Sequence, residues 1–223
     1  MRSETRQMTL LRIAPFALAA TLLYHGCAVG NRHAYHTTVA ALQASGSHTI
    51  AVATHDEREY VRSGNKQPDF VGLQRGGYGN PFKVTTESGH ALAQDVTDSI
   101  TASLRARGFH AVPVATSHQE DLAAVGRRLI DARAARALLL VLNEWKADSM
   151  QNTALIYAVT LRVLDMDGRV LAEKNLIGRD NLGGSFWNPP AHAKTAIPAA
   201  FKAKLEALLN SPDVLAAFDG VAH

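Results

Sequence analysis

The sequence predicts one α/β domain, a mixed β-sheet with helices packed on it, and three patterns indicate that fold class. Residues 137–145 form an unbroken apolar run, which is typical of a strand covered on both faces. Residues 153–164 alternate between apolar and polar side chains and lead into an Asp-Gly turn, a pattern typical of a β-hairpin. Residues 90–107 carry apolar side chains every four positions, which indicates an amphipathic helix. Helices between early strands, followed by a hairpin, predict a mixed sheet.

The first half of the domain is predicted to alternate strands and helices. The short apolar run at 49–54 is expected to be a strand. The helix over 90–107 should stop at Gly108, the residue that most often follows a helix C-terminus. Residues 109–114 are expected to return as a strand at or near a sheet edge, because Pro113 has no backbone donor for a neighbouring strand.

A second helix is predicted to precede the central strand. Ser117 and Glu120 have the spacing of a capping box, so we expect them to open a helix that reaches about Ala134. The strand at 137–145 follows directly. Its two-sided apolar character places it in the middle of the sheet.

The last part of the domain is predicted to be a hairpin and a helix. The strands at 153–164 and 169–177 flank the Asp-Gly turn. The final long helix is expected to take its first regular turn near Pro198, and a short helix at 213–218 ends the chain. The predicted element order is β-α-β-α-β-β-β-α.

The segment 59–88 fits neither periodicity. It is rich in glycine, contains two prolines and carries four aromatic residues at intervals. A loop of this length is uncommon in a compact domain unless it is functional or disordered, and its aromatic residues argue against disorder. We expect a long, partly ordered loop packed on the domain, with a small hairpin as one possible form.

The N-terminus is typical of a bacterial lipoprotein signal peptide. Arg2, Arg6 and Arg12 form a basic lead, an apolar run follows at 13–23, and Cys27 is the only cysteine of the chain. The run is too short to cross a bilayer, which takes roughly 20 apolar residues, and this arrangement is typical of an export signal. We predict cleavage before Cys27 and acylation of its sulfur and its new amine.

This prediction divides the chain into a signal peptide at 1–26, a tether at 27–47 rich in small and polar residues, and the α/β domain at 48–223. Ala28 stands where an aspartate would commonly signal retention in the inner membrane, so we expect an outer-membrane anchor that faces the periplasm. The leucine of the lipidation box stands one place early. Two alternatives therefore stay open: an ordinary export signal cut nearby, for instance after Gly30, or a disordered or helical N-terminus of a cytosolic protein. Translation from Met8, which leaves only Arg12 in the basic lead, also stays open.

Charge argues against a nucleic-acid partner. The chain carries 23 basic and 20 acidic residues, a net charge of +3. Removal of residues 1–26 leaves 20 basic and 19 acidic residues, a net charge of +1. We find no basic stripe of the kind that nucleic-acid-binding domains carry.

Several short motifs resemble ligand sites but lack the residues such sites require. The glycine-rich run at 76–79 has neither the preceding strand nor the small residue, at the position of Phe82, that a dinucleotide loop needs. The turn at 165–168 lacks the later ligands of a calcium loop. His33 and His36 have helical spacing for a shared metal but fall in the expected tether. We therefore expect no metal site, no cofactor and no catalytic residue.

Two groups of aromatic residues fall in loops rich in glycine, asparagine and proline: Tyr78 with Phe82, and Phe186 with Trp187. Such side chains either fold back into the core or are offered to a partner, and we favour the core for them. If they are exposed, the loops 70–82 and 182–190 become the candidate contact surface. Its residues would then be Arg75, Tyr78, Phe82, Phe186 and Trp187.

A resemblance rests on motifs along the domain: Asp56-x-Arg58 after the first strand, Arg107-Gly108-Phe109 at a helix end, Trp145-Lys146-Ala147-Asp148 after the central strand, Asp167-Gly168 in the hairpin and Ala199-Ala200 in the last long helix. In these motifs and their order the chain resembles the YajG-like family of small bacterial lipoproteins. The resemblance implies a lipid-anchored α/β domain that faces the periplasm, and it implies no catalytic residues. The chain departs from the family pattern in its long loop and in its lipidation box.

The sequence thus predicts a non-enzymatic lipoprotein of the cell envelope that acts as a binding or accessory module. Its expected partners are membrane lipid, through acylated Cys27, and an envelope protein. The alternative is an envelope hydrolase or small-ligand-binding enzyme, which would have to draw its site from the loop at 59–88.

Overall fold

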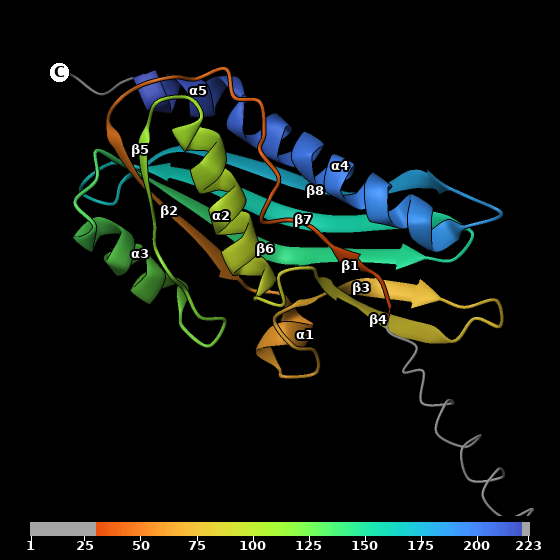
Figure 1. Cartoon of the computed structure of the whole chain (residues 1–223). Coiled ribbons are helices and arrows are strands. Elements are labelled where there is room, and N and C mark those ends of the chain that lie inside the picture. Colours follow the sequence, from red (N-terminus) through yellow and green to blue (C-terminus); the bar gives the residue numbers. More distant parts are fainter. Residues whose placement is uncertain (1–29, 220–223) are drawn as a thin grey trace, which may run out of the picture.

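The computed structural model describes residues 30–219 and centres on an eight-stranded mixed sheet with helices on both faces (Figure 1). The fold class predicted from the sequence is confirmed. The strands are β1 (Arg32–His33), β2 (Thr49–Asp56), β3 (Phe70–Arg75), β4 (Pro81–Thr86), β5 (His110–Pro113), β6 (Arg136–Ser149), β7 (Asn152–Leu164) and β8 (Val170–Gly184). The helices are α1 (Glu59–Arg62), α2 (Leu92–Arg105), α3 (Leu122–Asp131), α4 (Pro189–Leu209) and α5 (Pro212–Asp219).

Strand β6 is the centre of the sheet, as its apolar run predicts. Its first half pairs in parallel with β2, its last residues pair in parallel with β3, and its other edge pairs antiparallel with β7 along almost its whole length. Residues 136–142 are all buried. Leu138 and Leu140 face one apolar cluster, whereas Leu139 faces a second, because successive side chains of a strand point to opposite faces.

The two faces of the sheet carry different helices. The larger cluster holds the buried sides of α2, α4 and α5, and the smaller cluster holds α3 over β2 and β6. Figure 1 shows α4 running along β8 from one end of the sheet to α5 at the other. These helices fix where the strand ends and their connecting turns lie.

Several local predictions are confirmed. β5 lies at the edge of the sheet, and β7 and β8 form the hairpin around the Asp-Gly turn, with Gly168 at a φ of 82°. Gly108 follows α2 at a φ of 93°, a left-handed conformation that favours glycine. The short last helix is α5.

The expectation of a long loop at 59–88 is wrong in extent, whereas the small hairpin named as one possible form is present. The segment forms α1 and the antiparallel hairpin β3–β4, whose first strand pairs with β6. Buried polar contacts hold it in place: the Arg58 guanidinium is ion-paired with Asp56 at 2.6 Å, donates to the Phe70 carbonyl at 2.6 Å and donates to the distant Trp145 carbonyl at 3.3 Å. The pattern of apolar residues within 59–88 does not predict these contacts, because Arg58, which makes them, lies just before the segment.

The expected tether also needs correction. Its described part, residues 30–47, packs against the domain: β1 pairs in parallel with β4, and Tyr35 is fully buried between Trp145 and Phe201. The backbone amide of Ala40 donates to the Ser103 hydroxyl at 2.8 Å. The anchoring prediction falls on residues 1–29, so Cys27 lies outside the described residues.

Two helix starts differ from prediction. Helix α3 begins after Asp121, whose carboxylate accepts from the Ala124 amide at 2.6 Å, and the predicted pair Ser117 and Glu120 forms a turn before the helix. Helix α4 begins after Asn188, so Pro198 lies inside the helix instead of at its start. In both cases a nearer side chain caps the free amides of the first turn.

Candidate functional site

Exposed apolar side chains gather where several strands end. β3 and β6 run in parallel and finish side by side, β7 starts beside the last residue of β8, and α4 begins just after β8. Three turns therefore meet at one end of the sheet, at the right of Figure 1: 76–80, 150–151 and 185–188. We name this surface the aromatic end and define it by Tyr78, Met150, Phe186 and Trp187.

The aromatic side chains of this end are exposed. Tyr78 is 98% exposed, Trp187 is 91% exposed and Phe186 is 78% exposed, and the last two rings stack edge to face at 5.3 Å. The favoured placement of these three rings in the core is wrong. The core on the helix side of β6 is already filled by other rings, among them Trp145 and Phe201, whose centroids are 5.6 Å apart.

Arg75 and Phe82, the other two candidate contact residues, hold the hairpin in place. The Arg75 guanidinium donates to both carboxylate oxygens of Asp148 at 2.9 Å, and this pairing holds the pKa of Asp148 below its ordinary value. Phe82 is half-buried, and its ring lies over Gly76, where a Cβ would sit 3.1 Å from it. These two side chains fix Tyr78 at the tip of the hairpin.

The described chain starts at this same end. The Asn31 amide donates to the Gln74 side chain at 3.2 Å, and the Asn31 side chain donates to the Pro190 carbonyl at 2.6 Å. Asn31 thus bridges the β3–β4 hairpin, which carries Tyr78, and the start of α4, which follows the turn with Phe186 and Trp187. Since β1 runs parallel to β4, which starts at the hairpin turn, the chain reaches β1 from the direction of the aromatic end.

Sequence reasoning missed two residues of this surface. Met150, 45% exposed, lies in the β6–β7 turn, and Asn31 lies in the segment expected to be a tether. A methionine followed by Gln-Asn between two apolar strands is a signal for a turn, but it does not show which other turns lie beside it.

The motif residues Asp56 and Arg58 form a buried structural brace. The Arg58 guanidinium contacts both Asp56 oxygens and also donates to the carbonyls of Pro68, Phe70 and Trp145. These bonds fasten α1 and the start of β3 to β6. All the contacts are internal, so this motif supports the hairpin and does not form a site.

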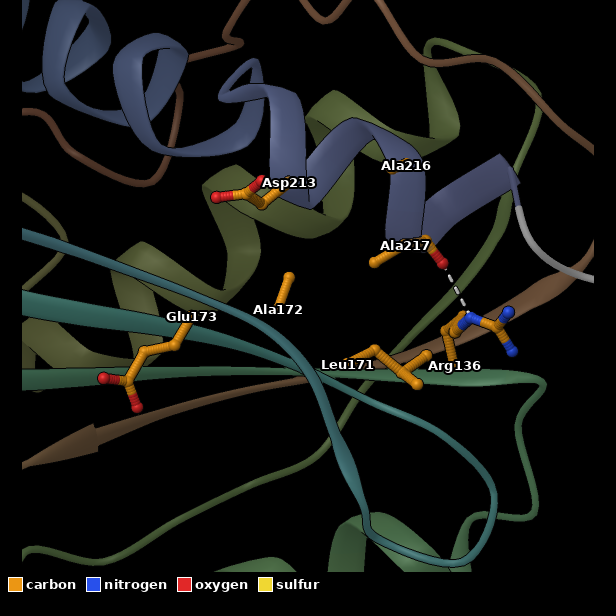
Figure 2. Close-up of a pocket in the computed structure, with 7 residues that line it drawn as sticks. All are labelled: Arg136, Leu171, Ala172, Glu173, Asp213, Ala216 and Ala217. Atoms are coloured by element: carbon orange, nitrogen blue, oxygen red, sulfur yellow. Dashed lines mark hydrogen bonds between the residues drawn. The ribbon is translucent and has the colours of Figure 1, made fainter.

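Two open grooves of the described residues bring no catalytic group together. The larger, about 550 Å³, lies between β8 and α5 (Figure 2). There Arg136 donates to the Ala217 carbonyl at 2.8 Å, while Glu173 points away and pairs with Arg162. The smaller, about 450 Å³, lies beside Met150, and its acids are held by ion pairs to Arg75 and Lys204.

The two histidines considered for a metal have separate surroundings. Burial, helped by Lys194, lowers the pKa of His33 to about 4, and its ring lies edge-on to Tyr35. His36 lies 3.9 Å from the buried Asp95 carboxylate. Within residues 30–219 we find no group of three side chains that could hold a metal ion, and no helix there is long and apolar enough to span a membrane.

The sheet order and helix placement define the class of protein: an α/β domain with a curled mixed sheet. Among solved structures, the chain is similar to protein XCC0632 from Xanthomonas campestris, of the DUF330 family, with a TM-score of 0.55 and 13% identity. The match covers 87% of this chain and 99% of that one, so the two share their fold along nearly the whole domain.

Weaker likenesses extend to two other bacterial proteins. Lipoprotein GNA1162 from Neisseria meningitidis gives a TM-score of 0.41 at 11% identity, over 72% of this chain and 95% of that one. PelC from Paraburkholderia phytofirmans, solved as a dodecamer, gives 0.41 at 15% identity, over 83% and 95%. Scores below 0.5 are too low to assign a fold. No family model matches the chain, and no curated protein matches its sequence significantly.

Proposed function

We propose that this chain is a lipid-anchored, non-enzymatic accessory module of the bacterial envelope, similar to the YajG-like lipoproteins. In this proposal acylated Cys27 holds the domain at the outer membrane, on the periplasmic side, and the domain works by contact. The observation that carries the proposal is the aromatic end, where three aromatic side chains stand almost fully in solvent.

Exposed aromatic residues are informative because they cost solubility and because they dominate binding energy where surfaces meet. The hairpin tip that carries Tyr78 is held by an Arg75–Asp148 ion pair, and the loop that carries Trp187 leads into the Asn188 cap of α4. Rings held by such supports fit a built contact surface. Its partner in this proposal is another component of the envelope, protein or lipid.

The hydrolase alternative draws its site from residues 59–88. In the structure this segment forms α1 and the β3–β4 hairpin, and its described side chains line neither of the two grooves. No specific observation in residues 30–219 favours that alternative.

The anchor is tested by cell fractionation of the full chain with and without Cys27→Ser. The proposal expects the natural chain in the membrane fraction, labelled by radioactive palmitate, and the variant unlabelled and released. A variant that stays in the membrane pellet unchanged contradicts lipid anchoring.

The contact role is tested by chemical crosslinking in native membranes. We expect Tyr78→Ala combined with Trp187→Ala to lose crosslinked envelope components. The matched control is Met166→Ala, which removes an exposed apolar side chain from the β7–β8 turn at the opposite end of the sheet. If the aromatic pair and the control recover the same components in the same amounts, the aromatic end is not the contact surface.

A further inference from the structure

We propose that the aromatic end lies in the interfacial layer of the membrane, with Tyr78, Phe186 and Trp187 among the lipid headgroups. The inference rests on the proposed lipid anchor and names the partner of that same surface. It assigns the aromatic end to lipid in place of a protein, and it orients the whole domain relative to the bilayer.

The first argument is the reach of the chain. Gly30, the first described residue, packs against the Lys83 carbonyl of β4, and its neighbour Asn31 bridges the hairpin and the start of α4. Two residues lie between Cys27 and Gly30, which makes three steps along the chain, and a fully extended chain spans at most about 3.6 Å per step, or roughly 11 Å in all. With the acyl chains of Cys27 in the bilayer, this end of the sheet cannot stand far from the headgroups.

The second argument is the kind of side chain that is exposed here. Tryptophan and tyrosine are enriched where a protein meets the membrane–water boundary, because an apolar ring carries a polar group at one edge. In the described residues, every large exposed aromatic side chain lies at this end. The large apolar side chains exposed elsewhere are aliphatic: Val39, Val112, Ile130, Met166, Val170, Leu171 and Ile177.

The third argument is charge. The acids nearest this end are neutralised, Asp148 by Arg75 at 2.9 Å and Asp180 by Lys204 at 2.6 Å. Lys83 on β4 and Arg179 on β8 are exposed, and within residues 30–219 neither lies within ion-pair distance of an acid, although Arg179 is close enough to Asp148 to help lower the pKa of that carboxyl. Exposed cations on the strands that lead to this end suit the phosphates of lipid headgroups.

The fourth argument is shape. A stable protein interface buries about 800 Å² on each side and packs its aromatic anchors in fitted pockets. Here Tyr78 projects from one turn and the stacked Phe186 and Trp187 from another, and β3 and β8 lie three strand spacings apart, roughly 14 Å at about 4.8 Å each. One exposed ring and one exposed pair of rings, separated by such a span, fit a fluid headgroup layer better than the surface of a folded partner.

The proposal fixes the direction of the domain. Strand β7 has 13 residues, so its far end lies roughly 40 Å from the aromatic end at about 3.3 Å per residue. The β7–β8 turn with Met166, and the groove of Figure 2, then face away from the bilayer. In this orientation, the surfaces that face the periplasm are the ones available to contact other envelope components.

Fluorescence of Trp187 tests the proposal, because the other tryptophan, Trp145, is only 3% exposed. The full chain, acylated in a bacterial host, is reconstituted into vesicles of phosphatidylethanolamine and phosphatidylglycerol with and without brominated phosphatidylcholine. We expect brominated lipid to remove about half or more of the Trp187 emission, as an interfacial ring requires. Trp187→Phe should abolish this quenching. Met166→Trp in the Trp187→Phe background is the matched control and should not be quenched.

The outcomes separate the two proposals. Flotation with the vesicles and quenching of Trp187 support both. Flotation of the chain without quenching leaves the anchor intact and overturns the membrane contact. If brominated lipid does not quench Trp187, and its emission changes only after solubilised envelope proteins are added, the membrane contact is also overturned, in favour of a protein partner. A full chain that does not float with the vesicles contradicts the anchor and the contact together.

Discussion

The two tryptophans of the chain give a direct comparison between a ring in the core and a ring at the aromatic end. Trp145 is 3% exposed, its ring packs against three other aromatic rings, and its indole N–H donates to the Tyr35 hydroxyl at 3.2 Å. Trp187 is 91% exposed and contacts the ring of Phe186. Each is changed to alanine in otherwise identical protein.

The expected effects differ several-fold. Trp145→Ala should cost about 3–5 kcal/mol in the free energy of unfolding, since it removes a large buried ring and leaves a buried hydroxyl without its donor. At about 2–4 °C per kcal/mol for a domain of this size, the melting temperature should fall by roughly 6–20 °C. Trp187→Ala should change the free energy by no more than about 0.5 kcal/mol, as exposed substitutions do.

Denaturant titration followed by circular dichroism measures both values. The reasoning is refuted if Trp187→Ala destabilises the domain as strongly as Trp145→Ala, because the ring of Trp187 would then be part of the core. A stable Trp145→Ala variant would equally contradict the account of the ring cluster around β6.

Three further predictions concern the scaffold. Arg58→Ala should cost about 3–5 kcal/mol, because it leaves a buried carboxylate unpaired, whereas Arg62→Ala, which breaks a surface ion pair, should cost about 0–1 kcal/mol in the same titration. Gly72→Ala should cost roughly 1–3 kcal/mol and speed amide exchange in the β3–β4 hairpin, since a Cβ there would collide with the Ala147 carbonyl. Burial lowers the pKa of His33 from 6.5 to about 4, so the folded protein binds fewer protons than the unfolded chain between these values. Stability should therefore fall by about 3 kcal/mol as the pH drops from 6.5 to 4, and His33→Gln should flatten that slope in unfolding measured at each pH.

The central elements could be predicted because their signals are local. Burial on both faces makes 137–145 apolar without interruption, and burial on one face makes 153–164 alternate. The Asp-Gly turn then fixes the hairpin, and Gly108 marks the end of α2. Each of these features depends on residues within a few positions of one another.

The elements that were missed depend on distant contacts. Residues 30–47 join the domain through alternate buried side chains, but most of these are small or polar, such as Ala40 and His33, so the sequence shows no clear apolar alternation there. The β3–β4 hairpin is held by Arg58, which donates to backbone carbonyls. Since every residue has a backbone carbonyl, the sequence does not show which ones Arg58 contacts. Sequence alone also does not show whether an aromatic residue in a glycine-rich turn faces the core or solvent, so Tyr78 and Trp187 were misplaced.

The candidate contact residues divide for the same reason. Arg75 and Phe82 are residue types common at interfaces. Within the fold, however, Arg75 is ion-paired with Asp148, and the ring of Phe82 packs over Gly76. Only the topology, which sets three turns side by side at one end of the sheet, distinguishes these supports from the exposed rings.

Photo-crosslinking in living cells tests the central claim most directly. A benzophenone amino acid replaces Trp187 in the full, acylated chain, and the same residue replaces Met166 at the opposite end as a control. After irradiation, the account predicts a phospholipid adduct at position 187, seen by mass spectrometry, and no lipid adduct at position 166. A protein adduct at position 187, or lipid adducts at position 166 in its place, would contradict it.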